Sequence, residues 1–338
     1  MKAIQIEKPG IVREVQIEKP VPSEGEVLLK INIIGLCGSD MSSYLGKNPM
    51  VQYPLIPGHE ISATITEIGN NVPDTFNIGE KVTVVPYTNC GTCSSCKNGR
   101  AYACRYNQTL GVQRDGALVE FITVPWQKII KASSLNEKEL ALAEPLTVGF
   151  HAIARGEVTD SDTVMVLGCG MIGTGAIIRA ALRGAKVIAV DIDDSKLAIA
   201  RELGAEFTIN SLNENVHDKI EAITDGHGPS VVVEAAGNPK TYLMAVKEVA
   251  FTGRIVCIGY VKDEVSFATK LFVQKEMDIR GSRNATASDF EAVIKYLETG
   301  KCPVEKLITK TVKIENSQEV FKYWEENLAK VLKILIEV

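Results

Sequence analysis

The sequence predicts an α/β fold in which a doubly wound parallel sheet is joined to a mostly-β domain. Residues 163–191 read as strand, glycine-rich turn, helix and second strand, and strands continue to alternate with helices to about residue 280. Before about residue 140, short runs in which apolar and polar residues partly alternate are separated by clusters of Pro, Gly and Asn. At 338 residues the chain is too long for one ordinary core, so we expect two domains.

We expect the domain boundaries where the pattern of predicted strands and helices changes. Residues 1–144 form the mostly-β domain, residues 145–285 the doubly wound domain, and residues 286–338 a tail that is too short for its own core and returns to the first domain. In the first domain we expect strands at 26–34, 61–68, 81–85 and 118–124. In the second we expect strands at 164–167, 186–190, 207–210, 230–235, 254–259 and 277–280, with helices at 195–203 and 215–223 and after Pro239. The tail contributes helices at 289–297 and 318–327 and a strand at 330–336.

The glycine-rich turn is a G-x-G-x-x-G that predicts a dinucleotide site. The first glycine permits a tight turn, the second lets the backbone approach a pyrophosphate, and the third lets the helix pack closely on the strand. An acid at the end of the second strand suits a ribose diol and opposes a 2′-phosphate, so we expect NAD rather than NADP. An ordinary strand-to-helix turn is the alternative. The predicted cofactor-binding residues are Gly168, Gly170, Met171, Ile172, Gly173 and Asp191.

Composition excludes several classes of function. A net charge of −5 without a basic block gives no footprint for nucleic acid. No apolar run reaches membrane-spanning length, and the first residues lack the apolar core of a signal peptide, so we expect a cytoplasmic protein that binds no membrane. In that compartment eight cysteines indicate metal binding or packing rather than disulfides.

Half of these cysteines lie within fifteen residues. Cys90, Cys93, Cys96 and Cys104 follow a C-x2-C-x2-C-x7-C spacing in a loop rich in Gly, Ser and Asn. Four thiolates with no position for water are typical of a structural zinc site. A disulfide within the loop is the alternative.

A second set of metal-binding side chains is spread along the first domain. It comprises Cys37, His59, Glu60 and Glu144. Each has an ordinary explanation alone: a buried thiol, a turn histidine, a helix-capping acid. Together, thiolate, imidazole and carboxylate form a sensible ligand set for catalytic zinc with one position left open.

These residues resemble the zinc-dependent medium-chain alcohol dehydrogenases in order and approximate spacing. Glu60 after His59, and Glu144 in place of a cysteine, are similar to the polyol branch with sorbitol and threonine dehydrogenases. Residues 281–286 resemble the L-galactonate and L-gulonate 5-dehydrogenases. The resemblance covers nearly the whole chain and implies a GroES-like catalytic domain, a Rossmann NAD-binding domain, a reaction in the cleft between them, and a dimer or tetramer.

The resemblance also implies roles for single residues. Zinc supplies the acidity that an alcohol lacks near neutral pH. Ser39 would accept the hydroxyl proton, although a turn-forming hydroxyl is the alternative. Glu144 would hold a water at the metal or enter its ligand set. Relatives often place a histidine five residues after the first cysteine to complete the proton relay, whereas this chain has Ser42.

Four residues are candidates for substrate binding. Thr147 and Phe150 follow the Glu144-Pro145 pair and are expected to face substrate or nicotinamide. Arg114 offers a planar fork matched to a carboxylate, unless it pairs with Asp115 or Glu120 on the surface. Arg283 is a second carboxylate candidate, with the cofactor or the domain junction as its alternative partner.

The resulting hypothesis is NAD-dependent oxidation of a secondary alcohol of a small-molecule polyol or sugar acid to the ketone. A threonine-type amino-alcohol dehydrogenase is the alternative within enzymes. A non-catalytic NAD-binding protein is the alternative outside them, although the retained Cys37, Ser39 and His59 argue against lost chemistry.

Overall fold

A computed structural model describes residues 1–338, and the chain forms two compact units. Unit 1 comprises residues 1–144 and 290–338, and unit 2 comprises residues 145–289. The second crossing therefore falls at Asp289–Phe290, a few residues beyond the expected boundary. None of the helices is both long and apolar enough to cross a membrane.

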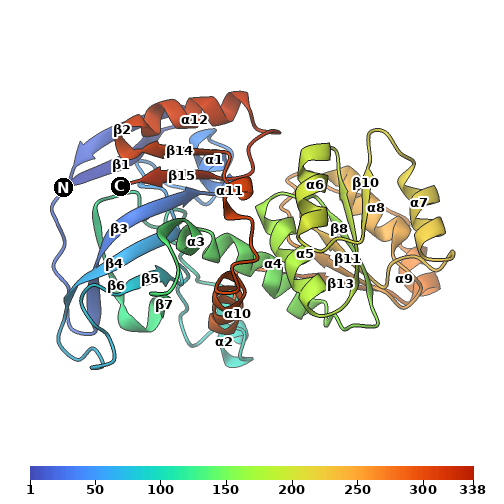
Figure 1. Ribbon diagram of the computed structural model, residues 1–338, viewed down its shortest axis with the longest axis horizontal. Helices are drawn as coiled ribbons and strands as arrows, with labels where there is room; N and C mark the ends of the chain where they lie inside the picture. The colour runs from blue at the N-terminus through green and yellow to red at the C-terminus, as the bar shows by residue number, and fades with distance from the viewer. The chain divides into compact units, whose positions relative to one another are not determined.

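Unit 1 is built on a seven-stranded sheet in which the strand order is β14-β15-β3-β4-β5-β7, with β6 also paired to β3. The C-terminal strand β15 pairs with β3, so the end of the chain lies beside a strand from its beginning (Figure 1). A separate hairpin is formed by β1 and β2. The strands are β1 (Lys2–Lys8), β2 (Ile11–Gln16), β3 (Glu26–Leu36), β4 (Glu60–Ile68), β5 (Lys81–Val84), β6 (Phe121–Pro125), β7 (Ile129–Lys131), β14 (Lys310–Lys313) and β15 (Ile334–Glu337). The helices are α1 (Gly38–Tyr44), α2 (Ser94–Lys97), α3 (Glu137–Ala141), α10 (Ala287–Leu297), which begins in unit 2, α11 (Val304–Leu307) and α12 (Ser317–Glu326).

Two strands of unit 1 are displaced from the sequence prediction by local hydrogen bonds. Residues 117–118 donate to Pro57 O and Gly58 O instead of pairing with β3, so β6 begins only at Phe121. At the C-terminus, the amides of Lys330 and Val331 donate to Asn327 O and continue the turn after α12. The final strand therefore begins at Ile334.

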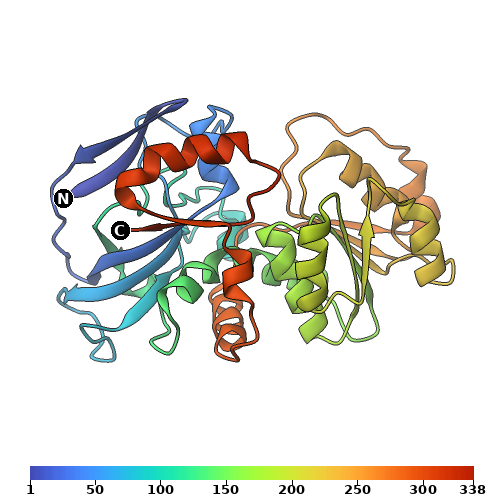
Figure 2. The same ribbon diagram turned by 45° about the horizontal axis from the view of Figure 1, so that its top comes forward.

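Unit 2 is a parallel six-stranded sheet with the order β10-β9-β8-β11-β12-β13. Its strands are β8 (Thr163–Leu167), β9 (Lys186–Asp191), β10 (Phe207–Asn210), β11 (Val231–Glu234), β12 (Arg254–Cys257) and β13 (Asp278–Gly281). Its helices are α4 (Ala143–Arg155), which begins in unit 1, α5 (Met171–Leu182), α6 (Asp194–Glu202), α7 (Val216–Ile223), α8 (Pro239–Glu248) and α9 (Lys270–Lys275). Figure 2 shows α5 and α6 on one face of the sheet and α8 on the other, as expected when the strand order reverses at β8. This is a Rossmann arrangement.

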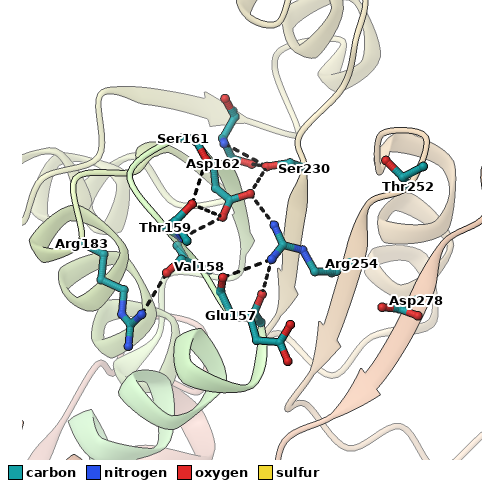
Figure 3. Close-up of polar contacts among 12 residues, drawn as sticks. Glu157, Val158, Thr159, Ser161, Asp162, Arg183, Ser230, Thr252, Arg254 and Asp278 are labelled. Atoms are coloured by element: carbon teal, nitrogen blue, oxygen red, sulfur yellow. Dashed lines mark hydrogen bonds and ion pairs between the residues drawn. The ribbon is translucent and has the colours of Figure 1, made fainter.

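Buried polar contacts join the start of three strands in unit 2, as Figure 3 shows. The carboxylate of Asp162 accepts hydrogen bonds from the Ser230 hydroxyl at 2.7 Å and from the Thr159 amide at 2.8 Å. It also forms an ion pair with the guanidinium of Arg254, which in turn donates to Gly156 O at 2.8 Å. Every charge in this cluster has a partner within the protein, so the cluster is structural.

Candidate active site

Strand register assembles the dispersed ligand set of unit 1. Cys37 follows the last residue of β3, and Glu60 opens the antiparallel strand β4, where it pairs with Gly35. A Cβ atom at Gly35 would lie 2.1 Å from Glu60 Oε2, so only glycine leaves room for this carboxylate. The end of β3 and the start of β4 therefore bring Cys37, His59 and Glu60 together.

The three side chains fit a metal ion. Cys37 Sγ, one ring nitrogen of His59 and one carboxylate oxygen of Glu60 all lie within 4.8 Å of one another. Burial alone would lower the pKa of His59, but the neighbouring Cys37 and Asp40 outweigh it and raise this pKa well above its usual value. His59 Nδ1 is buried without a hydrogen-bond partner. A pocket that favours positive charge and leaves a nitrogen unsatisfied suits Zn²⁺.

Two neighbours along the chain complete this region. Asp40 is fully buried and accepts hydrogen bonds from the Cys37 amide at 2.8 Å and the Gly58 amide at 3.1 Å, which ties the two ligand-bearing loops together. Ser39 Oγ is buried and has no partner in the protein. An unsatisfied buried hydroxyl is costly, so a bound ligand that bonds to Ser39 would be favoured.

A buried lysine that the sequence analysis missed contacts Glu60. Lys333 is 3% exposed and lies just before β15, whose first residue pairs with Leu36. Its Nζ donates to both carboxylate oxygens of Glu60 at 2.6 and 2.5 Å and to Leu36 O at 3.0 Å. The only sequence signal was a lysine entering an apolar C-terminal strand, and its partner lies 273 positions away.

Glu144 lies near this cluster without joining it. It is 3% exposed in the first turn of α4, and it is not among the residues whose ligand atoms lie within 4.8 Å of one another. Burial raises the pKa of Glu144 above its usual value, and the nearby His59 opposes this shift only in part. The hydroxyl of Tyr87, also missed from the sequence, donates to Glu144 Oε1. Burial and Glu144 raise the pKa of Tyr87 well above its usual value.

The four-cysteine loop forms a second, separate cluster. All four sulfur atoms lie within 4.8 Å of one another, and Cys93 Sγ lies 3.5 Å from Cys96 Sγ and 3.8 Å from Cys104 Sγ. Tetrahedral ligands with Zn–S bonds of 2.3 Å lie about 3.8 Å apart, so the loop fits zinc. All four cysteines are free in this structure, and no disulfide joins them. The Ser95 hydroxyl and the Cys96 amide lower the pKa of Cys93 to about 5.

The glycine turn of unit 2 has the geometry of a dinucleotide site. Gly168 adopts a φ of +93°, which permits the tight turn, and a Cβ atom at Gly173 would lie 1.8 Å from Gly168 O. Gly170 instead faces open space, with no atom within 4 Å of such a Cβ. Met171 and Ile172 open the twelve-residue helix α5, whose N-terminus favours a phosphate.

Asp191 ends β9 beside this turn. Its Oδ2 accepts the Cys169 amide at 2.6 Å, and its Oδ1 accepts the amides of Ile192 and Asp193 at 2.7 and 3.0 Å. Asp191 therefore fixes the glycine turn through the amide of Cys169.

The four candidates for substrate binding differ in their burial and their contacts. Thr147 and Phe150 are fully buried within α4, and the Phe150 ring lies 5.3 Å from the guanidinium of Arg179, so neither exposes surface to a substrate in this structure. Arg283 is half-buried after β13, beside Asn284, which has a φ of 55°.

Arg114 is exposed and forms no ion pair with either carboxylate considered from the sequence. Asp115 accepts the Ile56 amide at 2.9 Å, and Glu120 accepts the Lys2 amide at 2.6 Å. Its guanidinium is therefore available to an anionic group.

Comparisons with known proteins agree with this geometry. Residues 23–134 match the alcohol dehydrogenase GroES-like domain family, and residues 172–299 match the zinc-binding dehydrogenase family. L-galactonate-5-dehydrogenase from Escherichia coli (strain K12) is 31% identical over 312 residues, covering 91% of each chain. Sorbitol dehydrogenase from Bacillus subtilis (strain 168) is 32% identical over 334 residues, covering 96% of this chain and 94% of that protein. The crystal structure of RspB from E. coli CFT073, a short chain alcohol dehydrogenase complexed with NADH, has a TM-score of 0.91 at 31% identity and covers 100% of this chain and 99% of its own.

Proposed function

Because the chain belongs to the zinc-type medium-chain alcohol dehydrogenase family, we propose that it oxidises a secondary alcohol of a polyol or sugar acid to the ketone and reduces NAD. The observation that carries this proposal is the cluster of Cys37, His59 and Glu60. The buried hydroxyl of Ser39 lies two residues further along the chain from Cys37.

The residues of this site divide the work of the reaction. Cys37, His59 and Glu60 would hold a zinc ion, which would supply the Lewis acidity that an alcohol needs to lose its proton near neutral pH. Ser39 Oγ, which has no partner in the protein, accepts that proton. Ser42 offers no imidazole to continue the relay, so the proton leaves through water. Unit 2 binds NAD at Gly168, Gly170, Met171, Ile172 and Gly173 and at Asp191.

Within this class we propose a sugar acid of the L-galactonate or L-gulonate kind as the substrate. The similarity to L-galactonate-5-dehydrogenase from Escherichia coli and the availability of the Arg114 guanidinium support this choice. A charge-assisted hydrogen bond to substrate typically contributes about 1.5–3 kcal/mol. We also expect a dimer or tetramer, which analytical ultracentrifugation would measure.

The test is NAD reduction by the purified protein with L-galactonate, L-gulonate, sorbitol, galactitol and L-threonine. Arg114→Ala should lower kcat/KM for the sugar acids roughly tenfold or more and leave sorbitol oxidation unchanged. Arg100→Ala, which removes another exposed arginine of unit 1, is the matched control and should alter neither.

Other outcomes would support the rival functions. Preference for neutral polyols, or equal loss of both substrate classes in Arg114→Ala, would refute the sugar-acid assignment and leave the polyol class. Preference for L-threonine would support the amino-alcohol alternative. NAD binding without turnover of any substrate would support the non-catalytic alternative.

A further inference from the structure

Tyr87 is a buried phenol whose partner, Glu144, lies near the proposed zinc site. It lies three residues beyond the end of β5 and is 5% exposed. The chain on either side is fixed, because the Val85 amide donates to Lys128 O at 2.8 Å and Pro86 O accepts the Leu110 amide at 3.1 Å. The Tyr87 hydroxyl donates to Glu144 Oε1. Its position is therefore set by the backbone on which it lies.

The two buried carboxylates near the cluster have different partners. Glu60 is paired with the ammonium of Lys333 and offers an oxygen to the ligand set. Glu144 accepts a hydrogen bond from a neutral phenol and stays outside that set. Sulfur and oxygen ligands of one zinc ion lie at most about 4.4 Å apart, the sum of their bond lengths. Glu144 therefore cannot share the ion with the other three ligands in this arrangement.

We propose that Tyr87 is a positioning residue that holds Glu144 beside the zinc ligand set and so keeps the remaining ligand position open for the substrate. This inference rests on the proposed function. Without the hydroxyl, the buried carboxylate of Glu144 loses a donor and gains most by moving to the cation. Glu144 and substrate would then compete for one position.

The test compares Tyr87→Phe with the wild type after both proteins are loaded with Co²⁺, whose visible d–d absorption changes with the ligands bound to the ion. The four-cysteine cluster contributes equally to both proteins and cancels in the difference spectrum. We expect an altered d–d band for Tyr87→Phe, because the Glu144 carboxylate would then occupy the position that is open in the wild type. We also expect a KM for the alcohol raised by about 10-fold, within the range typical of residues that orient ligands. The added variant Tyr87→Phe/Glu144→Gln should restore the wild-type spectrum, because an amide is a poorer ligand than a carboxylate.

The matched control is Tyr53→Phe, which removes another phenol hydroxyl of unit 1 that donates to Ser43 O at 2.5 Å. It should leave the cobalt spectrum and KM unchanged. A wild-type spectrum in Tyr87→Phe would overturn the proposal, as would a change that Glu144→Gln does not reverse. Failure of the proposed function has a different signature, since the wild type itself would then bind fewer than two metal ions or reduce no NAD.

Discussion

The two proposed metal clusters of unit 1 are built in opposite ways. Cys90, Cys93, Cys96 and Cys104 lie on one short loop, and backbone amides stabilise their sulfur atoms, as where the Cys93 amide donates to Cys90 Sγ at 3.3 Å. Cys37, His59 and Glu60 come instead from the ends of two paired strands, and Glu60 is further held by a lysine that lies just before a third strand. The first cluster is local and partly exposed, and the second is non-local and largely buried.

This difference separates a stabilising role from a chemical one. Four thiolates fill a tetrahedral shell and leave no position for another molecule. The second cluster has three ligands of three chemical kinds, and the carboxylate of Glu144 lies near it outside the ligand set. The local cluster should therefore govern the stability of its loop, and the non-local cluster should govern the reaction.

The largest expected effect contrasts one ligand from each cluster. His59→Ala should abolish NAD-dependent turnover and remove one zinc ion per chain, while the melting temperature stays near that of the wild type. Cys93→Ser should also remove one zinc ion, but it should lower the melting temperature and leave turnover in the remaining folded protein, because metal binding and local folding are coupled. Elemental analysis, calorimetry and steady-state kinetics measure these outcomes. If both variants lose activity and stability equally, the division of roles is wrong.

The sequence was informative where chemistry is encoded by spacing. The four cysteines and the glycine turn each lie in one continuous segment, so residues 90–104 and 168–173 predicted a zinc site and a dinucleotide site directly. The α/β fold with its parallel Rossmann sheet was also predictable, because buried parallel strands are continuous apolar runs. Cys37, His59, Glu60 and Glu144 were grouped because their side chains form a sensible zinc ligand set, and the structure brings the first three together while Glu144 stays outside.

The residues that contact Glu60 and Glu144 could not be predicted from the sequence. Lys333 reaches Glu60 only through the pairing of β15 with β3, and Tyr87 reaches Glu144 across 57 positions. A pattern along the chain does not determine which strands become neighbours. β14 was missed for a related reason, since Lys310–Lys313 is a short edge strand with a lysine at each end.

The second prediction tests how far the stability of the non-local cluster depends on the positive charge of Lys333. Lys333→Met leaves the buried carboxylate of Glu60 without its cation and should cost about 3–5 kcal/mol in the free energy of unfolding. The loss should be smaller in zinc-loaded protein than after chelation, because the ion then offsets the charge of Glu60. Urea unfolding under the two conditions measures both values.

Lys333→Arg is the control for this second prediction, because it retains the positive charge in a different shape. It should lose less stability than Lys333→Met. Equal losses in the two variants would show that the packing of the lysine stem matters more than its charge.

The smallest expected effect concerns Asp162 of unit 2, a carboxylate whose partners all belong to the protein. Burial alone would raise its pKa, but Ser230, Thr159 and Arg254 outweigh it, so the folded-state pKa lies below the usual value. The ionised form is therefore favoured by folding. Its stabilisation should be complete above the unfolded-state pKa of about 3.9 and should disappear as the pH falls through the folded-state pKa. Urea unfolding of wild type and Asp162→Asn should thus differ at pH 7 and converge in acid. Chelation of zinc should leave this stability difference unchanged, in contrast to the effect of Lys333→Met. A difference that changed with zinc would contradict the view that the partners of Asp162, unlike those of Glu60, all belong to the protein.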